Sequence, residues 1–308
     1  MMGDRKITVG SHDIEISNLD KVFFPEESIT KGDLIDYYRR IAPVMLPHLE
    51  ERALMMHRYP DGISQQGFYQ KEISDYFPDW VERTAVERKE RGGSQTLVVC
   101  NNAATLVYLA NQACITPHVW LSRRDKPEYP DKLIFDLDPP SVDFEPVWRG
   151  ARFLKQILEE IGLTSFVMTT GSKGLHVMVP LDRKGHFDDV RTFASELADY
   201  LTRKEPELFT TEPRKDKRRD RLFLDYLRNA YAQTAVPPYA VRAKPGAPVA
   251  APLDWHELES RAIHSSTYNI KNIFRRLGQK DDPWKMAMRK PESLDEPRKR
   301  LKDTRKKN

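Results

Sequence analysis

The sequence predicts an α/β fold, and three observations support this prediction. Around residues 133–227, apolar runs of strand length alternate with longer amphipathic runs at helical spacing. The 308 residues suffice for one large hydrophobic core or two modest ones. The composition, 39% hydrophobic and 31% charged residues, is that of a well-charged globular protein. We expect one compact domain over residues 1–288, with an N-terminal α/β part to about residue 125, a second part over 126–288, and a basic, disordered tail over 289–308.

Composition also narrows the class of protein. The 50 Lys and Arg residues against 46 Asp and Glu residues give a net charge of only +4, so the whole chain is not a strong polycation. Its cysteines, Cys100 and Cys114, form neither a disulfide framework nor a Cys-x-x-Cys zinc motif. No stretch of about 18 apolar residues is present. We therefore expect a cytoplasmic protein with reduced thiols, no zinc and no membrane partner.

The N-terminal part begins with alternating residues over 5–17, which predict a hairpin. Thr30 and Asp33 have the spacing of a helix capping box, and Pro43 is expected to end or kink the helix that follows. Lys31 lies in the first turn of this helix, where free N–H groups favour anions. With Lys21 it could hold a phosphate, although from spacing alone two ordinary surface lysines are the commoner explanation.

Two aromatic residues and one histidine in the N-terminal part have more than one interpretation. Phe68 and Tyr69 could stack on nucleic-acid bases, or one ring could be buried by a strand. A charged hairpin is expected over 83–95, and a helix over 102–115. His118 follows that helix; it could touch a triphosphate, but a lone histidine is more often structural.

An acidic strand organises the second part of the chain. Residues 132–138 form a short apolar run that ends at Pro139. Side chains alternate along a strand, so Asp136 and Asp138 share one face, ~7 Å apart at their Cα atoms. A divalent cation would relieve their repulsion, since carboxylate oxygens suit Mg²⁺ or Mn²⁺. For a single Asp-x-Asp, two solvated acids in a turn is the commoner explanation, so the site needs partners elsewhere.

Residues after the acidic strand supply such partners. Proline and glycine bound a helix between Pro146 and Gly162, and a strand over 165–169 follows. The Gly-Ser172-Lys173-Gly turn offers N–H groups, a hydroxyl and an ammonium to a phosphate, without the spacing of a Walker loop. His176 comes next, on a strand of alternating character.

The last elements complete this pattern. A helix is expected over 187–203, a charged loop over 210–221, an apolar strand over 222–227 that carries Asp225, and a helix over 266–278. Acids on two separate strands, together with phosphate-binding cations, point to two-metal phosphoryl transfer.

The sequence resembles the archaeo-eukaryotic primase superfamily, and within it the polymerase domain of the bacterial ligase D repair system. The resemblance runs from Ile16 to about Asp282. It is carried by Leu-Ile-Phe-Asp136-Leu-Asp138-Pro, Thr-Gly-Ser172-Lys173-Gly-Leu-His176, and Phe-Leu-Asp225 with Pro-Tyr-Ala-Val-Arg242. It implies a primase-polymerase fold with mixed central sheets flanked by helices and an RRM-like catalytic module.

The resemblance also implies a function and roles for individual residues. The expected activity is template-directed, two-metal addition of nucleotides, with a preference for ribonucleotides, at DNA gaps and breaks in non-homologous end joining. The catalytic metal ligands would be Asp136, Asp138 and Asp225. Nucleotide-binding residues would be His118, Ser172, Lys173, His176, Arg228 and Arg242. DNA-binding residues would be Asn18, Lys21, Lys31, Arg58, Phe68, Tyr69, Lys71, Arg218 and Arg219, and the basic runs 83–91 and 214–221 would contact the DNA ends.

The cofactors and partners follow from the same resemblance. We expect two Mn²⁺ or Mg²⁺ ions, an NTP or dNTP substrate, and gapped or broken double-stranded DNA with a 5′-phosphate. Without a Lys-x-Asp-Gly ligase motif, the chain is expected to be a stand-alone, nucleoid-associated prokaryotic polymerase, with Ku and a separate ATP-dependent DNA ligase as partners.

Three residues depart from the family pattern. Tyr69 stands where a phenylalanine is expected, His57 where a lysine is expected, and Arg228 at what looks like a glutamine position.

Several other functions remain open. A Mn²⁺-dependent glycosyltransferase would use Asp136 and Asp138 but not Asp225. A HAD-type phosphatase would need Thr or Val at the position of Pro140. A catalytically idle DNA-end bridging module would not need all three acids, and a replicative primase would be expected to carry cysteine clusters for zinc.

Overall fold

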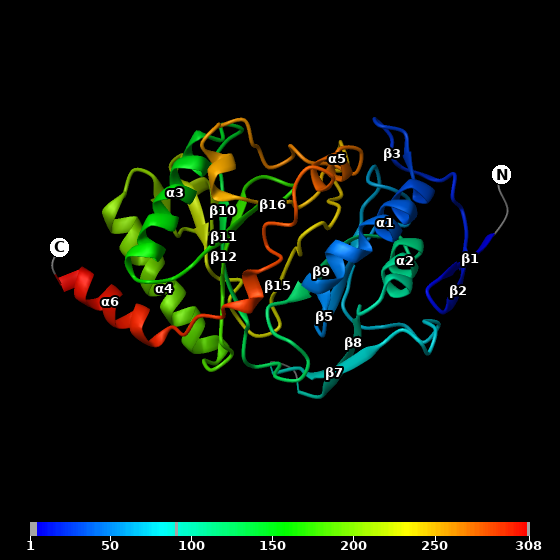
Figure 1. The fold of residues 1–308 in the computed structure, drawn as a ribbon, viewed down its shortest axis with the longest axis horizontal. Helices are drawn as coiled ribbons and strands as arrows, with labels where there is room; N and C mark the ends of the chain where they lie inside the picture. The colour runs from blue at the N-terminus through cyan, green and yellow to red at the C-terminus, as the bar shows by residue number, and fades with distance from the viewer. Residues whose placement is uncertain (1–4, 90–91, 307–308) are drawn as a thin grey trace. The chain divides into compact units, whose positions relative to one another are not determined.

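The computed structural model describes residues 5–89 and 92–306, which Figure 1 shows as a ribbon. The chain forms two compact units. The first unit contains the chain up to Asp125 together with Thr234–Ala250 and Tyr268–Phe274. The second unit contains Lys126–Gln233, Ala251–Thr267 and the chain from Arg275 onward. Among the helices in the described ranges, none combines the length and apolar character needed to cross a bilayer.

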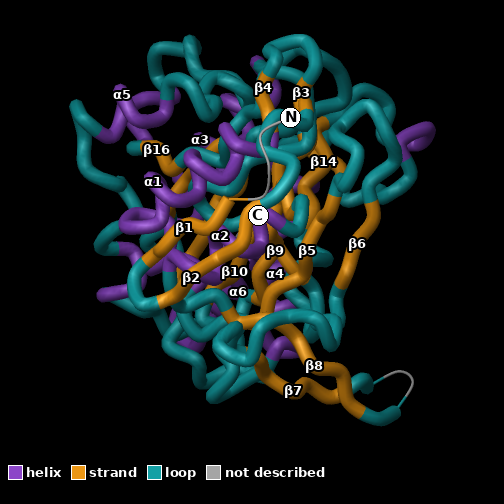
Figure 2. The backbone as a smooth tube through the Cα atoms, turned by 90° about the vertical axis from the view of Figure 1, so that its right-hand side faces the viewer, coloured by secondary structure: helices purple, strands orange, loops and turns teal. Residues whose placement is uncertain are grey.

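The first unit is built around an antiparallel sheet with the strand order β15-β9-β5-β8-β7, and β6 pairs with β5. In Figure 2, β7 and β8 of this sheet lie side by side. Its sheet strands are β5 Ala53–Arg58, β6 Phe68–Gln70, β7 Arg83–Glu87, β8 Ser94–Val99, β9 Cys114–Trp120 and β15 Thr234–Ala235. Two hairpins join β1 Arg5–Val9 to β2 His12–Ile16 and β3 Val22–Phe24 to β4 Ile29–Thr30. The helices are α1 Lys31–Leu49 and α2 Ala103–Asn111, which pack together. The predicted hairpin over 5–17 is confirmed.

Helix α1 begins as predicted but does not end at Pro43. The Thr30 side chain accepts a hydrogen bond from the backbone N–H of Asp33, and the Asp33 side chain accepts one from the backbone N–H of Thr30. Pro43 and Pro47 both lie inside the helix. Each interior proline costs about 3 kcal/mol in an isolated helix. Burial of an apolar stripe against the rest of the unit outweighs this cost; the stripe is Leu34, Tyr38, Ile41, Met45 and Leu49.

Helix α2 is shorter than the predicted helix over 102–115. It ends at Asn111, and Ala113 has a left-handed backbone with φ 60°. The chain then enters β9, whose residues are all buried. Ile115, Thr116 and Val119 are β-branched and favour this central strand over a continued helix.

The second unit contains a mixed sheet with the strand order β13-β14-β10-β12-β11-β16. The strands are β10 Lys132–Asp138, β11 Phe166–Thr169, β12 Leu175–Pro180, β13 Phe209–Thr210, β14 Leu222–Asp225 and β16 Pro252–Leu253. Helices α3 Glu145–Glu160 and α4 Phe187–Lys204 pack on one side of the sheet (Figure 1). The order β10-α3-β11-β12-α4-β14, with β10 between β12 and β14, is the split β-α-β arrangement of RRM-like modules.

The strand register gives the two faces of this sheet different chemistry. Leu137 lies opposite Leu175 on β12 and Leu224 on β14, and all three are fully buried. Asp136 lies opposite His176 and Asp225. Residues directly opposite each other in a ladder point to the same face, so the apolar residues line one face and the polar residues the other.

The C-terminal part differs from the prediction. Only the short helix α5 Ile273–Leu277 forms within the predicted helix over 266–278. The predicted disordered tail over 289–308 contains helix α6 Asp295–Lys306, which packs on α4 and buries Leu301 completely. Arg298 fixes it further by donating to the backbone oxygen of Asp189. Residues 307–308 lie outside the described ranges. Within residues 5–89 and 92–306 the structure also has three short 3₁₀ helices: η1 Lys215–Lys217, η2 Trp255–Leu258 and η3 Ala287–Arg289.

Candidate active site

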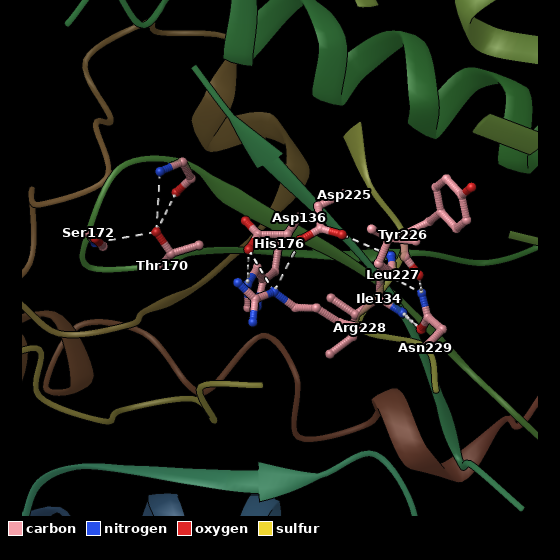
Figure 3. A network of polar contacts seen from close by, with 11 residues as sticks. Ile134, Asp136, Thr170, Ser172, His176, Asp225, Tyr226, Leu227, Arg228 and Asn229 are labelled. Carbon is pink, nitrogen blue, oxygen red and sulfur yellow. Dashed lines mark hydrogen bonds and ion pairs between the residues drawn. The ribbon is translucent and has the colours of Figure 1, made fainter. Parts of the chain in front are cut away.

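Three carboxylates lie on the polar face of the second unit's sheet. Asp136 and Asp138 come from β10, and Asp225 ends β14 directly opposite Asp136. The Oδ2 atom of Asp136 lies 3.0 Å from Nε of Arg228 and 3.5 Å from Nε2 of His176 (Figure 3). The same Nε of Arg228 lies 3.8 Å from Oδ2 of Asp225. The structure thus brings together the acids that the sequence places on two separate strands.

Burial and neighbouring charges shift the pKa values of these acids in opposite directions. Burial alone would raise the pKa of Asp136, but His176 and Arg228 outweigh it and hold that pKa well below its usual range. Burial, followed by the charge of Asp136, raises the pKa of Asp138 to about 6. Burial also raises the pKa of Asp225. Asp138 is therefore the acid whose negative charge is least compensated by the protein itself.

This difference predicts a stabilising substitution. Asp138 binds its proton more tightly in the folded chain than in the unfolded chain, where its pKa is near 4. The free energy of unfolding therefore falls as the pH rises from about 4 to about 6, by about 3 kcal/mol at most. Asp138→Asn should recover this loss at pH 7 in EDTA and give no gain below pH 4. Urea denaturation at both pH values measures this gain in the free energy of unfolding. Equal stability of the variant and the wild type at pH 7 would contradict the prediction.

The acidic cluster has the carboxylate oxygens that a divalent cation requires, although the Arg228 side chain already places a positive charge beside them. Within the described residues, Oδ1 of Asp136 is buried and accepts no hydrogen bond. Such an oxygen is costly unless a ligand satisfies it, and carboxylate oxygens are the preferred ligands of Mg²⁺ and Mn²⁺. Over the same part of the chain, no three Asp, Glu, His or Cys side chains converge on one point as they would around an ion. The Arg228 guanidinium contacts two of the acids instead.

A tight turn beside the acids is organised by Thr170. Its hydroxyl accepts hydrogen bonds from the backbone N–H groups of Ser172 and Gly174, at 3.3 Å and 3.2 Å. Gly174 lies so close to β10 that an added Cβ would come 1.7 Å from the backbone oxygen of Leu137. Ser265 donates from its hydroxyl to the backbone oxygen of Ser172. The turn that carries Ser172 and the exposed Lys173 is therefore fixed beside the end of the acidic strand.

Asn229 is a positioning residue that the sequence analysis missed. It is fully buried, and its side chain hydrogen-bonds both the backbone N–H and the backbone oxygen of Ile134, at 2.8 Å and 2.7 Å. Its Nδ2 also donates to the backbone oxygen of Tyr226. The amide thus takes the place of a strand partner for β10 just beyond Asp225 (Figure 3). A single asparagine after an apolar strand gives no sequence signal for this role.

Two predicted nucleotide-binding residues belong to the first unit. His118 lies on β9, and its ring centroid is 5.9 Å from that of Tyr69 and 6.3 Å from that of His57. Burial, followed by the charges of Arg242 and Lys244, lowers the pKa of His57 to about 4. His57 is therefore neutral near pH 7. His118 and Arg242 both neighbour His57, whereas the carboxylates lie in the second unit.

The predicted aromatic platform is exposed and supported from beneath. Phe68 and Tyr69 are 47% and 57% exposed on β6, so neither ring is buried by the strand. Tyr69 stacks on His57 with centroids 4.0 Å apart, and the Arg58 guanidinium lies 5.6 Å from the centroid of Phe68. Arg58 also donates to Gln70, Tyr76 and the backbone of Gln112. Arg58 therefore holds the platform in place, and Lys71 follows it as an exposed cation.

The predicted phosphate pocket forms a compact cluster at the start of α1. The backbone N–H of Lys31 donates to the backbone oxygen of Lys21, and the backbone N–H of Lys21 donates to the backbone oxygen of Asn18. Lys21 is partly exposed and pairs with Asp61 at 2.6 Å. Lys31 is only 5% exposed, and its Nζ donates to the backbone oxygen of Ser17 at 2.7 Å. Lys21 is thus the more accessible of these two ammonium groups.

The two basic segments differ in how their charges are used. In 214–221, Arg218 is buried, donates to the backbone oxygens of Glu212 and Pro213, and lies 3.9 Å over the ring of Phe223. Arg218 therefore fixes the loop to β14, while Arg219 is exposed in a left-handed conformation. The segment 83–91 begins in β7, and its residues 90 and 91 lie outside the described ranges.

Comparison with known proteins decides the family. Residues 30–284 match the family model described as "LigD, primase-polymerase domain". The chain belongs to this family. It is 35% identical over 286 residues to the bifunctional non-homologous end joining protein LigD of Bacillus subtilis, covering 92% of this chain and 45% of that protein. It is 32% identical over 278 residues to the multifunctional non-homologous end joining DNA repair protein LigD of Mycobacterium tuberculosis, covering 87% of this chain and 36% of that protein.

A solved structure in the LigD family agrees with the fold. The polymerase domain from Mycobacterium tuberculosis ligase D in complex with DNA superposes with a TM-score of 0.84 at 29% identity. The match covers 91% of this chain and 99% of that one. The primase-polymerase fold predicted from the sequence is therefore confirmed. The chain spans less than half the length of these curated LigD relatives.

Proposed function

We propose that this LigD-family chain adds nucleotides to a DNA primer under the direction of a template, at gaps and breaks repaired by non-homologous end joining. The register between β10 and β14 carries the proposal, because it sets Asp225 opposite Asp136 on the face that also bears Asp138. Membership of the LigD primase-polymerase family and the likeness to a polymerase domain in complex with DNA support it.

The three acids would hold two Mn²⁺ or Mg²⁺ ions. When bound, such ions lower the pKa of the attacking hydroxyl and stabilise the charge that develops on the phosphate. Asp136 is kept ionised by its neighbours, and its buried Oδ1 is available to a ligand. Asp225 is held in place because its Oδ1 accepts a hydrogen bond from the backbone N–H of Leu227 at 2.8 Å. These residues would supply the anionic cage, and no protein nucleophile is required.

The remaining polar groups would bind the incoming nucleotide. Ser172 and Lys173 lie on the fixed turn beside the acids, with His176 on the next strand. A hydroxyl near the sugar can prefer a 2′-OH, which would favour ribonucleotides. Arg228, His118 and Arg242 would contribute further contacts to the nucleotide.

Primer extension on a gapped duplex tests this function directly. The protein is given Mn²⁺ or Mg²⁺ and either ribonucleotide or deoxyribonucleotide triphosphates. We expect addition that follows the template, with faster addition of ribonucleotides. If the protein binds the gapped duplex but adds no nucleotide with either metal, a non-catalytic DNA-end bridging module becomes the better explanation. If it also starts chains without a primer, a replicative primase becomes the better one.

The cluster of Asn18, Lys21 and Lys31 predicts recognition of the 5′-phosphate at a gap. A charge-assisted hydrogen bond of this kind contributes about 1.5–3 kcal/mol, or roughly tenfold or more in affinity. Removing the 5′-phosphate should therefore weaken binding by the wild type but not by Lys21→Ala. Lys6→Ala is the matched control, since Lys6 is also a surface lysine of the first unit paired with an aspartate. Equal dependence on the phosphate in Lys21→Ala and wild type would contradict the assignment.

The same function implies particular partners. We propose gapped or broken DNA as the substrate, Ku and an ATP-dependent DNA ligase as proteins acting at the same ends, and the cytoplasmic nucleoid as the location. The names of the relatives, which describe non-homologous end joining and DNA repair proteins, support the repair context. Recovery of Ku with the tagged protein on broken DNA, and its absence without DNA ends, would test the partnership.

A further inference from the structure

Arg228 is the cation shared by two of the acids. It lies three residues after Asp225, and its Nε contacts Oδ2 of Asp136 at 3.0 Å and Oδ2 of Asp225 at 3.8 Å. The two carboxylates come from different strands, so the guanidinium joins β10 to β14 through charge (Figure 3). Asp136 and Asp225 are 7% and 15% exposed at their side chains. Two acids so close and so poorly hydrated repel each other unless a positive charge lies between them.

The position of Arg228 conflicts with binding of a metal ion. A Mg²⁺ or Mn²⁺ ion held by Asp136 and Asp225 would need oxygens of both carboxylates as ligands. The guanidinium hydrogen-bonds one oxygen of Asp136 and forms an ion pair with one oxygen of Asp225, so a second cation beside it would be repelled. The arginine and the ion are therefore alternatives for Asp136 and Asp225.

Arg228 is able to leave the acids without disturbing the backbone. Its side chain is 38% exposed, and the polar contacts that the structure gives it among the described residues are with these two carboxylates. The neighbouring residue Asn229 is anchored to β10 by two amide hydrogen bonds with Ile134, and a third goes to the backbone oxygen of Tyr226. A rotation of the Arg228 side chain alone would expose the acids.

We propose that Arg228 is an internal counter-ion that closes the acidic cluster in the metal-free protein and moves to the nucleotide's phosphates when the ions enter. The inference rests on the proposed function and deepens it. In the resting state the arginine stabilises Asp136 and Asp225 and weakens binding of free Mn²⁺ or Mg²⁺. A triphosphate offers the released guanidinium a new anionic partner. Metal and nucleotide therefore bind cooperatively, because each favours the state in which Arg228 has left the acids.

Binding of Mn²⁺ measured by electron paramagnetic resonance, without nucleotide, tests the proposal. Arg228→Gln should bind Mn²⁺ about tenfold more tightly than the wild type, within the usual range of coupling between two sites. Arg149→Gln is the matched control. It also removes one arginine of the second unit that pairs with a carboxylate, Glu205, and it should bind Mn²⁺ like the wild type. Equal or weaker Mn²⁺ binding by Arg228→Gln would overturn the proposal.

A second measurement covers the case in which the variant is unstable. In EDTA, Arg228→Gln should melt at a lower temperature than the wild type, since Asp136 and Asp225 have lost their counter-ion, and Mn²⁺ should restore its melting temperature more than it raises that of the wild type. A variant that stays unfolded with Mn²⁺ would contradict the proposal. Primer extension by the wild type is measured separately. Failure there removes the proposed function, whereas normal extension with unchanged Mn²⁺ affinity in Arg228→Gln removes only this inference.

Discussion

Replacement of Asp138 by alanine is expected to abolish nucleotide addition while DNA binding persists. Asp138 lies on the same face as Asp136 and Asp225, and its raised pKa shows that the protein leaves its negative charge poorly compensated. A carboxylate held in this way is available to a cation. Loss of one such electrostatic group in an active site costs about 10²–10³-fold in rate. Single-turnover primer extension on a gapped duplex, with DNA binding measured in parallel, checks the result.

The control for this variant is another aspartate of the second unit. Asp199 is exposed on α4, so Asp199→Asn should extend primers at the wild-type rate. Asp138→Asn keeps the size of the side chain and should lose activity as fully as Asp138→Ala, although it stabilises the metal-free fold. Normal extension by either Asp138 variant would refute the assignment of the metal site.

Replacement of Gly174 by alanine is expected to damage both the fold and the activity. The added Cβ would lie 1.7 Å from the backbone oxygen of Leu137, which belongs to the central strand and cannot move aside as a flexible side chain could. Forced backbone shifts of this kind place a substitution among the most destabilising, at about 3–5 kcal/mol. The shift would also displace Ser172 and the neighbouring Asp136 and Asp138. Urea denaturation and primer extension measure the two effects.

A second glycine provides the comparison. At Gly185 an added Cβ would have only ordinary contacts, 3.7 Å from the side chains of Asp189 and Val190. Gly185→Ala should therefore change the free energy of unfolding by less than about 1 kcal/mol. If Gly174→Ala lowers the free energy of unfolding as little as Gly185→Ala does, the turn does not approach β10 as closely as described.

The acids of the site were predictable because strands have a fixed side-chain period. Alternation placed Asp136 and Asp138 on one face, and a second apolar strand ending in Asp225 supplied a partner. The pairing of Asp225 with Asp136 depends on the register between β10 and β14, which lie far apart in the sequence, and no local pattern contains this register. The resemblance to the primase superfamily implies that these acids act together.

Residues whose role depends on tertiary contacts were harder to predict. Asn229 and Thr170 organise the site through hydrogen bonds to backbone atoms of other elements, and their sequence context does not indicate this. Pro43 was expected to end α1, but burial of the helix outweighs the cost of the proline. Leu301 is one apolar residue in a highly charged segment. It is nevertheless fully buried in helix α6, which packs on α4, although the composition of this segment predicts disorder.

The ladder between β10 and β14 also limits how the gene can change. Insertions in the charged loop 211–221 that keep the contacts of Arg218 alter only the length of the loop, whereas removal of one codon within Leu222–Leu224 would reverse the facing of every later side chain in β14. Asp225 would then point towards the helices, and Tyr226 would take its place opposite Asp136. In this family, we expect loops before this strand to vary in length between species, and the strand itself to tolerate substitutions but not single-residue deletions.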